Sequence, residues 1–190
     1  MPDWGKGHSG GRLRPALGIA VALAYGYGAA ECVAAVTIGS VALAANSIGH
    51  ITFASVYLLL LLAPAPARRR ALVIATSAIL ILPALIVLVE VWAHLDTPIA
   101  PSAAAIALMG AGACLVDLAA AALIAGIRPG GITFAAGLKA LLWPRAITGP
   151  MIVLTALATA STGSAWHDFI IGLGIAATNL ITAVAHWRTH

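Results

Sequence analysis

Six long apolar stretches fill most of the chain, separated by short segments rich in proline, glycine or charge. Each stretch is continuous rather than alternating, which favours helices over the strands of a membrane barrel. Each also reaches the roughly 20 residues needed to cross a hydrocarbon core of about 30 Å. The pattern predicts an all-α protein with helices over Pro15–Thr37, Ser40–Ala63, Ala71–Leu95, Ser102–Ile127, Thr133–Ala160 and Trp166–Trp187.

Composition points to the same environment. Hydrophobic residues make up 62% of the chain and charged residues 8%, whereas an ordinary soluble domain is roughly a quarter charged. This is too few polar side chains to cover the surface of a soluble globular protein. We therefore expect an integral membrane bundle of six transmembrane helices. Residues 1–11 are short, polar and glycine-rich, and are predicted to form a flexible tail. Residues 12–190 form the six-helix transmembrane domain.

Positive charge predicts the orientation. With six spans, the basic residues near the span ends all fall on one side of the membrane, whereas the other side carries Asp96 and Asp168. The basic residues on the first side are Lys6, Arg12, Arg14, Arg68, Arg69, Arg70, Arg128 and Arg188. Basic residues mark cytoplasmic loops, so we expect a multi-pass protein of the cell membrane with both termini cytoplasmic. The net charge of +4 is then an orientation signal, which leaves membrane lipids rather than nucleic acid as the expected surroundings.

Charged residues inside the spans are the candidate functional residues. A charge at the centre of a span costs roughly 2.5–3.5 kcal/mol on insertion scales, so such residues are functional candidates by default. Three acids, Glu31, Glu90 and Asp117, lie in spans one, three and four, and His50 lies near the middle of span two. Arg145 lies near the middle of span five, where it needs a carboxylate partner, Asp117 or Glu31, or an anionic ligand.

Two junctions of the chain carry a family resemblance. The segment from Glu31 to His50, with Gly39-Ser40 at its turn, resembles the first-to-second helix junction of cation diffusion facilitator transporters. The segment Thr162-Gly-Ser-Ala-Trp-His-Asp168 with Ile171-Gly-Leu-Gly174 resembles the fifth-to-sixth junction of that family, and Glu90 before Leu95–Pro98 fits its third helix. The resemblance implies a homodimer of six-helix bundles that exchanges a divalent metal for protons, here without the family's cytoplasmic domain.

The metal site of the family is altered in this chain. The resemblance implies ligand pairs four residues apart on helices two and five, and such pairs share one helix face. They fall on Gly49 and Phe53, and on Leu141 and Arg145. None of the four is a ligand of the family's type, so no metal is expected at Gly49, Phe53, Leu141 or Arg145, and no cofactor is expected. His50 and Asp117 are the candidates for relocated ligands.

Three functions remain open from the sequence. The first is a transporter on the cation diffusion facilitator scaffold with an altered, non-zinc-type central site, in which His50, Asp117 and the other acids handle protons or a different cation. The second is a membrane-embedded enzyme that isomerises or cyclises a lipophilic, prenyl-type substrate, which can be anionic. The third is a non-catalytic subunit derived from a transporter.

The enzyme hypothesis assigns the polar residues two roles. The candidate acid-base residues, which would supply a proton, are Glu31, His50, Glu90 and Asp117. The candidate substrate-binding residues are Arg145, Asn46, Phe53 and Trp143. A closed cavity around these side chains favours the enzyme, an open path favours the transporter, and complete pairing of Arg145 with no cavity favours the subunit.

Overall fold

The structure is a computed structural model that describes residues 10–62, 69–96, 98–125 and 132–188. These residues form six helices and no strand, as the apolar pattern predicts. The helices are α1 (Gly10–Ile38), α2 (Val41–Leu62), α3 (Arg69–His94), α4 (Ala103–Ala125), α5 (Ile132–Thr162) and α6 (Trp166–Arg188). Helix α1 begins five residues before the predicted start. Residues 1–9 of the predicted tail lie outside the described part of the chain.

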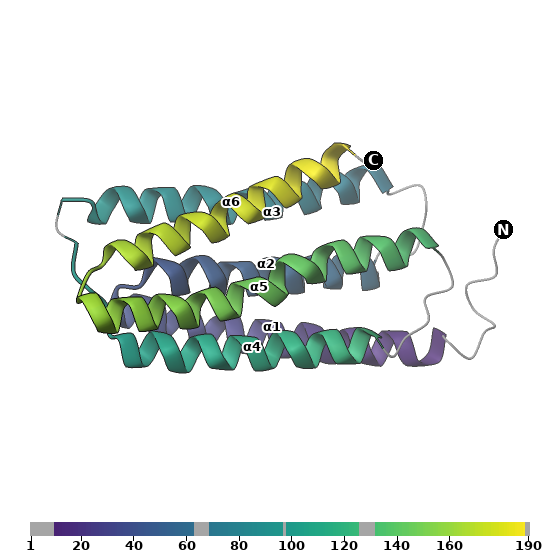
Figure 1. The fold of residues 1–190 in the computed structure, drawn as a ribbon. Helices are drawn as coiled ribbons and strands as arrows, with labels where there is room; N and C mark the ends of the chain where they lie inside the picture. The colour runs from purple at the N-terminus through teal and green to yellow at the C-terminus, as the bar shows by residue number, and fades with distance from the viewer. Residues whose placement is uncertain (1–9, 63–68, 97, 126–131, 189–190) are drawn as a thin grey trace.

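The helices lie side by side in an elongated bundle (Figure 1). The closest packing joins α1 to α2, α4 to α5 and α3 to α6. Helix α2 is the central element, because it contacts each of the other five helices. Residues on the inner faces of α1, α4 and α5 can therefore meet side chains of α2.

Two of the helix ends depend on glycine. Gly39 follows α1 and Gly163 follows α5, and both have positive φ angles, of 69° and 66°. This left-handed conformation is the usual end of a helix, and glycine adopts it without strain. These turns lie within the two junctions that carry the family resemblance.

A buried carboxylate joins the start of α2 to α6. Asp168, in the first turn of α6, accepts a hydrogen bond of 2.6 Å from the Ser40 hydroxyl and another of 2.6 Å from the N–H of Val41. The N–H of Ala42 donates to it at 3.3 Å. Asp168 therefore satisfies free N–H groups at the beginning of α2, so it fixes the two helices relative to each other.

The apolar interior consists of two clusters separated along the bundle. One cluster packs Leu17, Val21, Phe53 and Tyr57, among others, and the second packs Leu43, Ile106, Ile152, Phe169 and Ile175, among others. Between them, buried polar side chains come from four helices. The fold therefore places a polar layer in the middle of an apolar bundle.

The outer surface is that of a membrane protein. Three helices are long and apolar enough to cross a bilayer, over Pro15–Ile38, Val41–Leu58 and Ala103–Leu123. Large apolar side chains face outward, including Val36 and Trp92 at 79% exposure and Leu108 at 74%. A soluble monomer rarely exposes so much contiguous apolar surface, so lipid is the natural neighbour of these side chains.

Candidate functional site

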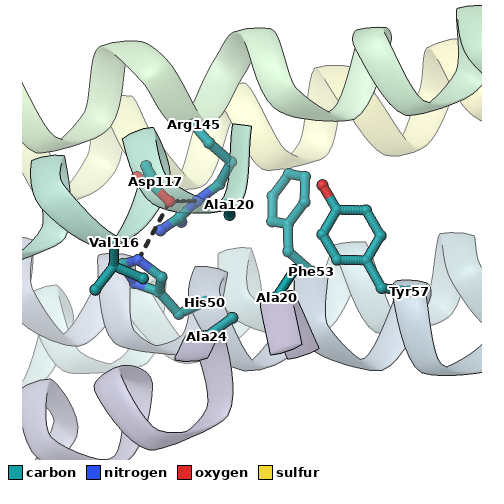
Figure 2. A pocket seen from close by; sticks show the side chains of 9 residues that line it. All are labelled: Ala20, Ala24, His50, Phe53, Tyr57, Val116, Asp117, Ala120 and Arg145. Carbon is teal, nitrogen blue, oxygen red and sulfur yellow. Dashed lines mark hydrogen bonds and ion pairs between the residues drawn. The ribbon is translucent and has the colours of Figure 1, made fainter. Parts of the chain in front are cut away.

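A polar layer of five side chains lies at the centre of the bundle. Glu31 comes from α1, Asn46 and His50 from α2, Asp117 from α4 and Arg145 from α5. Glu31, Asn46, His50 and Arg145 are at most 4% exposed, and the side chain of Asp117 is 13% exposed. Figure 2 shows His50, Asp117 and Arg145 directed toward one another. Four side chains that are costly to place in an apolar bundle therefore lie together: Glu31, His50, Asp117 and Arg145.

His50 lies between two carboxylates. Its Nδ1 is 3.1 Å from Oε2 of Glu31, and its Nε2 is 3.4 Å from Oδ1 of Asp117. The amide of Asn46 donates to the other Glu31 oxygen at 2.7 Å. The two nitrogens of an imidazole point in opposite directions, so one ring connects an acid of α1 with an acid of α4.

This geometry requires a proton. A neutral imidazole carries one N–H, and that N–H can donate to only one of the two carboxylates. The lone pair of the other nitrogen then faces a carboxylate oxygen, which is an unfavourable contact between two acceptors. A second proton, on His50 or on one of the acids, removes it. The two carboxylates therefore compete for the N–H of one imidazole.

Arg145 is the partner of Asp117. Its Nε donates to Asp117 Oδ1 at 3.3 Å, and its guanidinium carbon lies 5.3 Å from the centroid of the Phe53 ring, which is the geometry of a cation–π contact. Of the two carboxylates considered from the sequence, Asp117 rather than Glu31 makes this pair. The same Asp117 oxygen, Oδ1, faces both His50 and Arg145.

Gly49 makes room for the guanidinium. A Cβ added at Gly49 would lie only 2.6 Å from Arg145 Nη1, a distance that side-chain atoms cannot adopt without moving. Gly49 was predicted only as a position without a metal ligand. Its structural role as the space for the Arg145 head could not be read from the sequence, because nothing in the chain pairs α2 with α5 at this depth.

The polar layer is incompletely paired. Four buried atoms of the layer have no hydrogen-bond partner among the described residues: Asn46 Oδ1, His50 Nε2, Asp117 Oδ2 and Arg145 Nη2. The His50 Nε2 contact with Asp117 is within ion-pair distance but does not have the geometry of a hydrogen bond. Buried polar atoms are almost always paired in folded proteins, so the four unpaired atoms leave this layer capacity for a further hydrogen-bonding partner.

Two openings reach the polar layer. An inner cavity of about 20 Å³ is lined by His50, Phe53, Tyr57, Asp117 and Arg145, among others (Figure 2), which is room for about one water molecule. A larger groove of about 240 Å³ lies between α4 and α5. It is lined by Cys114, Asp117, Leu118, Ala121, Arg145, Ala146 and Pro150. Asp117 and Arg145 line both, so this ion pair separates the inner cavity from the groove.

The remaining predicted site residues are not in the layer. Glu90 lies near the end of α3, where it is half exposed and 3.7 Å from His94. Glu90 therefore does not join Glu31 and Asp117 in the layer, because residues four apart on one helix share a face and Glu90 pairs with His94 near the end of α3. The side chains of Trp143 and Leu141 lie outside the described part of the structure.

No described cluster is suited to a metal. No group of three or more His, Cys, Asp or Glu side chains within the described residues could hold an ion. His50 and Asp117, the candidates for relocated ligands, do adjoin, but Arg145 contacts the same carboxylate oxygen. Glu31 faces the opposite nitrogen of His50, so a single ion cannot touch all three side chains.

Tyr27 is a further neighbour of His50 in the site. Its ring makes an edge contact with His50 at 5.3 Å between centroids, and its hydroxyl donates to the carbonyl oxygen of Met109. Tyr27 lies four residues before Glu31, so helical periodicity places both on one face of α1. That spacing is the signal that could have found it.

Comparisons with known proteins add no assignment to this geometry. No protein-family model matches the chain, and no curated protein matches it.

Proposed function

We propose that this chain is a proton-coupled membrane transporter of cation-diffusion-facilitator-like architecture, whose central site is the polar layer rather than a zinc-type metal site. One observation carries the proposal: His50 lies between Glu31 and Asp117, at 3.1 Å and 3.4 Å, sealed inside the bundle. Ionisable residues inside a membrane bundle mark proton relays in pumps and transporters, and histidine is a common side chain for moving a proton.

The positions assigned through the family resemblance support the altered site. Gly49, Phe53 and Arg145 are three of the four positions where the family holds its metal ligands, and all three meet at one guanidinium group. The fourth, Leu141, has a side chain outside the described part. The Arg145 head thus occupies the space between α2 and α5 in which a cation is expected. A fixed positive charge there opposes a divalent ion.

Helix lengths support six spans. The six helices have 22 to 31 residues, which corresponds to about 33 to 47 Å, so each is long enough for a hydrocarbon core of about 30 Å. All six lie side by side in one bundle (Figure 1). With basic residues on one side of these spans, the proposal places both termini in the cytoplasm and the protein, as a homodimer, in the cell membrane.

The openings and the unpaired atoms favour transport over the two alternatives. An enzyme that folds a prenyl-type chain needs an enclosed apolar cavity, whereas the inner cavity has a volume of about 20 Å³. A purely structural subunit needs a fully paired Arg145, whereas Arg145 Nη2 and Asp117 Oδ2 lack partners among the described residues. The α4–α5 groove instead reaches the pair from the protein surface, as a transport path must.

The test is proton movement in liposomes that contain the purified protein and a trapped pH-sensitive dye. Gradients of zinc, sodium, potassium and organic cations are applied one at a time to wild type, His50→Gln and His94→Gln. We expect at least one solute other than zinc to drive proton movement in wild type and in His94→Gln, whose half-exposed histidine lies outside the layer. We expect His50→Gln to abolish this movement.

Two results contradict the proposal. One is zinc-driven proton movement that persists in His50→Gln, because it requires a metal site elsewhere. The other is the absence of solute-dependent proton movement in correctly folded wild type under every gradient.

A further inference from the structure

The α4–α5 groove, defined by the seven residues given above, combines apolar side chains with the Asp117–Arg145 ion pair, in which Asp117 Oδ2 and Arg145 Nη2 have no partner among the described residues. The carboxylate of Asp117 lies at its base and has one oxygen without a partner. Leu118, Ala146 and Pro150 are exposed at the surface and provide apolar walls. The cationic group that lines the groove, Arg145, already donates its Nε hydrogen to Asp117. The groove thus combines an apolar wall with an incompletely neutralised acid.

Pro150 adds a second acceptor. It lies inside α5 and has no N–H, so the carbonyl oxygen of Ala146, four residues earlier, does not receive its helical hydrogen bond. Ala146 and Pro150 both line the groove. Within membranes, freed backbone carbonyls of interrupted helices bind cations in several transporter folds. A residue whose backbone carbonyl lacks its helical hydrogen bond therefore lines the same groove as Asp117.

The charge of the polar layer limits which ligand can bind. The layer holds two carboxyl groups, Glu31 and Asp117, and one guanidinium group, Arg145, so the acidic groups outnumber the fixed cation by one. One proton or one singly charged cation restores neutrality. A divalent ion would leave an excess positive charge beside Arg145, and an anion would increase the negative charge, and both are costly in an apolar interior.

We propose that the α4–α5 groove binds a singly charged organic cation, which enters between α4 and α5 from the apolar surface and exchanges for a proton bound within the polar layer. The inference rests on the proposed function and names the substrate class of the same site. The apolar walls contact the organic part of the ligand, while Asp117 and the Ala146 carbonyl face its charge. One cation enters for each proton that leaves, so the charge of the layer is unchanged.

The groups around His50 set the direction of the pH dependence. They are Glu31 and Tyr27 from α1, Asn46 and Tyr57 from α2, Asp117 and Cys114 from α4, and Arg145 from α5, with Asn179 of α6 near Gly49. The acid of α3, Glu90, lies apart beside His94. Because a proton competes with the cation, affinity for the cation rises with pH, about tenfold per unit where one proton is displaced.

The test uses benzyltrimethylammonium as the probe, with its neutral isostere neopentylbenzene and the anion phenylacetate as controls. Binding to purified protein in lipid nanodiscs is measured by calorimetry between pH 6 and pH 8, in pairs of buffers with different heats of ionisation. These pairs give the number of protons released. We expect the cation alone to bind, with about one proton released and tighter binding at higher pH.

Two variants that add the same ring, one inside and one outside the groove, distinguish a loss of binding from a folding defect. Ala121→Phe fills the groove, and we expect it to weaken cation binding at least tenfold. Ala122→Phe adds the same ring at an exposed position outside the groove and should bind as wild type does. Asp117→Asn should abolish both binding and proton release.

Several results overturn the inference. These are binding of the neutral isostere as tightly as the cation, binding of phenylacetate in its place, cation binding without proton release, no cation binding, or equal binding by Ala121→Phe and wild type. If the probe does not bind while the liposome assay still shows His50-dependent proton movement with another solute, the proposed function stands and only this substrate class fails.

Discussion

Two buried aspartates of this chain have opposite environments. Asp168 is fully buried and accepts three hydrogen bonds, from the Ser40 hydroxyl and from the N–H groups of Val41 and Ala42, which engage both of its oxygens. Asp117 presents one oxygen to both His50 and Arg145, and its other oxygen has no partner among the described residues. The same side chain is saturated in one place and under-saturated in the other.

The number of hydrogen-bond partners distinguishes a carboxylate with a structural role from one that is available for function. A carboxylate with both oxygens bonded to fixed donors on a neighbouring helix holds the two helices together. A carboxylate with a free oxygen, between a histidine and an arginine, can accept a further donor. Its partner can change with protonation, which is what an exchange site needs.

The largest expected effect lies at the saturated aspartate. Asp168→Ala leaves the Ser40 hydroxyl and two N–H groups at the start of α2 without an acceptor, at a cost of about 1–3 kcal/mol for each buried unsatisfied group. We expect a loss of at least about 3 kcal/mol in the free energy of unfolding. Thermal unfolding in detergent measures it.

The matched control for this loss is Asp96→Ala, because Asp96 is exposed in the turn after α3. Its effect should stay within about 0.5 kcal/mol. If Asp168→Ala unfolds like wild type but stops proton exchange, the assignment of Asp168 as a structural residue is wrong.

The sequence predicted the helices because their signal is long and continuous. Six apolar stretches became six helices, with ends displaced by a few residues, as at Gly10 and Thr162. The turns at Gly39 and Gly163 have a local cause, because each contains a glycine that adopts a positive φ angle without strain. The number of spans and the side of the termini depend on a bilayer, so they remain predictions from charge and length.

The sequence predicted which charged residues belong to the site, but it did not predict all of the contacts between them. Single buried charges identify Glu31, His50, Asp117 and Arg145 because each is costly in an apolar helix. Which of them touch depends on helix rotation and packing, and one position of helix register turns a side chain by about 100°. For this reason the sequence left Asp117 and Glu31 open as partners of Arg145 and gave Gly49 no role beside Arg145.

An intermediate effect tests the space that Gly49 leaves. Gly49→Ala places a Cβ 2.6 Å from Arg145 Nη1, so the guanidinium must move away from its position over Phe53. Overpacking of this kind costs about 1–3 kcal/mol. We expect a loss near the lower end of this range, because the contact is the end of a flexible side chain, together with a lower rate of proton exchange in liposomes.

Gly26→Ala is the control for this variant. It adds the same methyl group in α1 where nothing lies within 4 Å, and alanine is favoured over glycine in a helix by about 1 kcal/mol. It should leave proton exchange unchanged and stabilise the fold slightly. Equal effects of Gly49→Ala and Gly26→Ala on both measurements would show that Arg145 does not need the space.

The smallest change in stability, with a complete loss of function, is expected when the Asp117–Arg145 pair is neutralised as a whole. Removing one partner of a buried ion pair leaves the other uncompensated, whereas replacing both by neutral groups of similar shape is often close to neutral. The double variant Asp117→Asn/Arg145→Gln should therefore have a free energy of unfolding within about 1 kcal/mol of wild type, and each single variant should be less stable than the double.

Proton exchange should be absent in the double variant, because neither a carboxylate nor its counter-ion remains beside His50 Nε2. If the double variant lost as much stability as Asp168→Ala, both aspartates would be structural, and the contrast between a saturated and an under-saturated carboxylate would not mark the functional site.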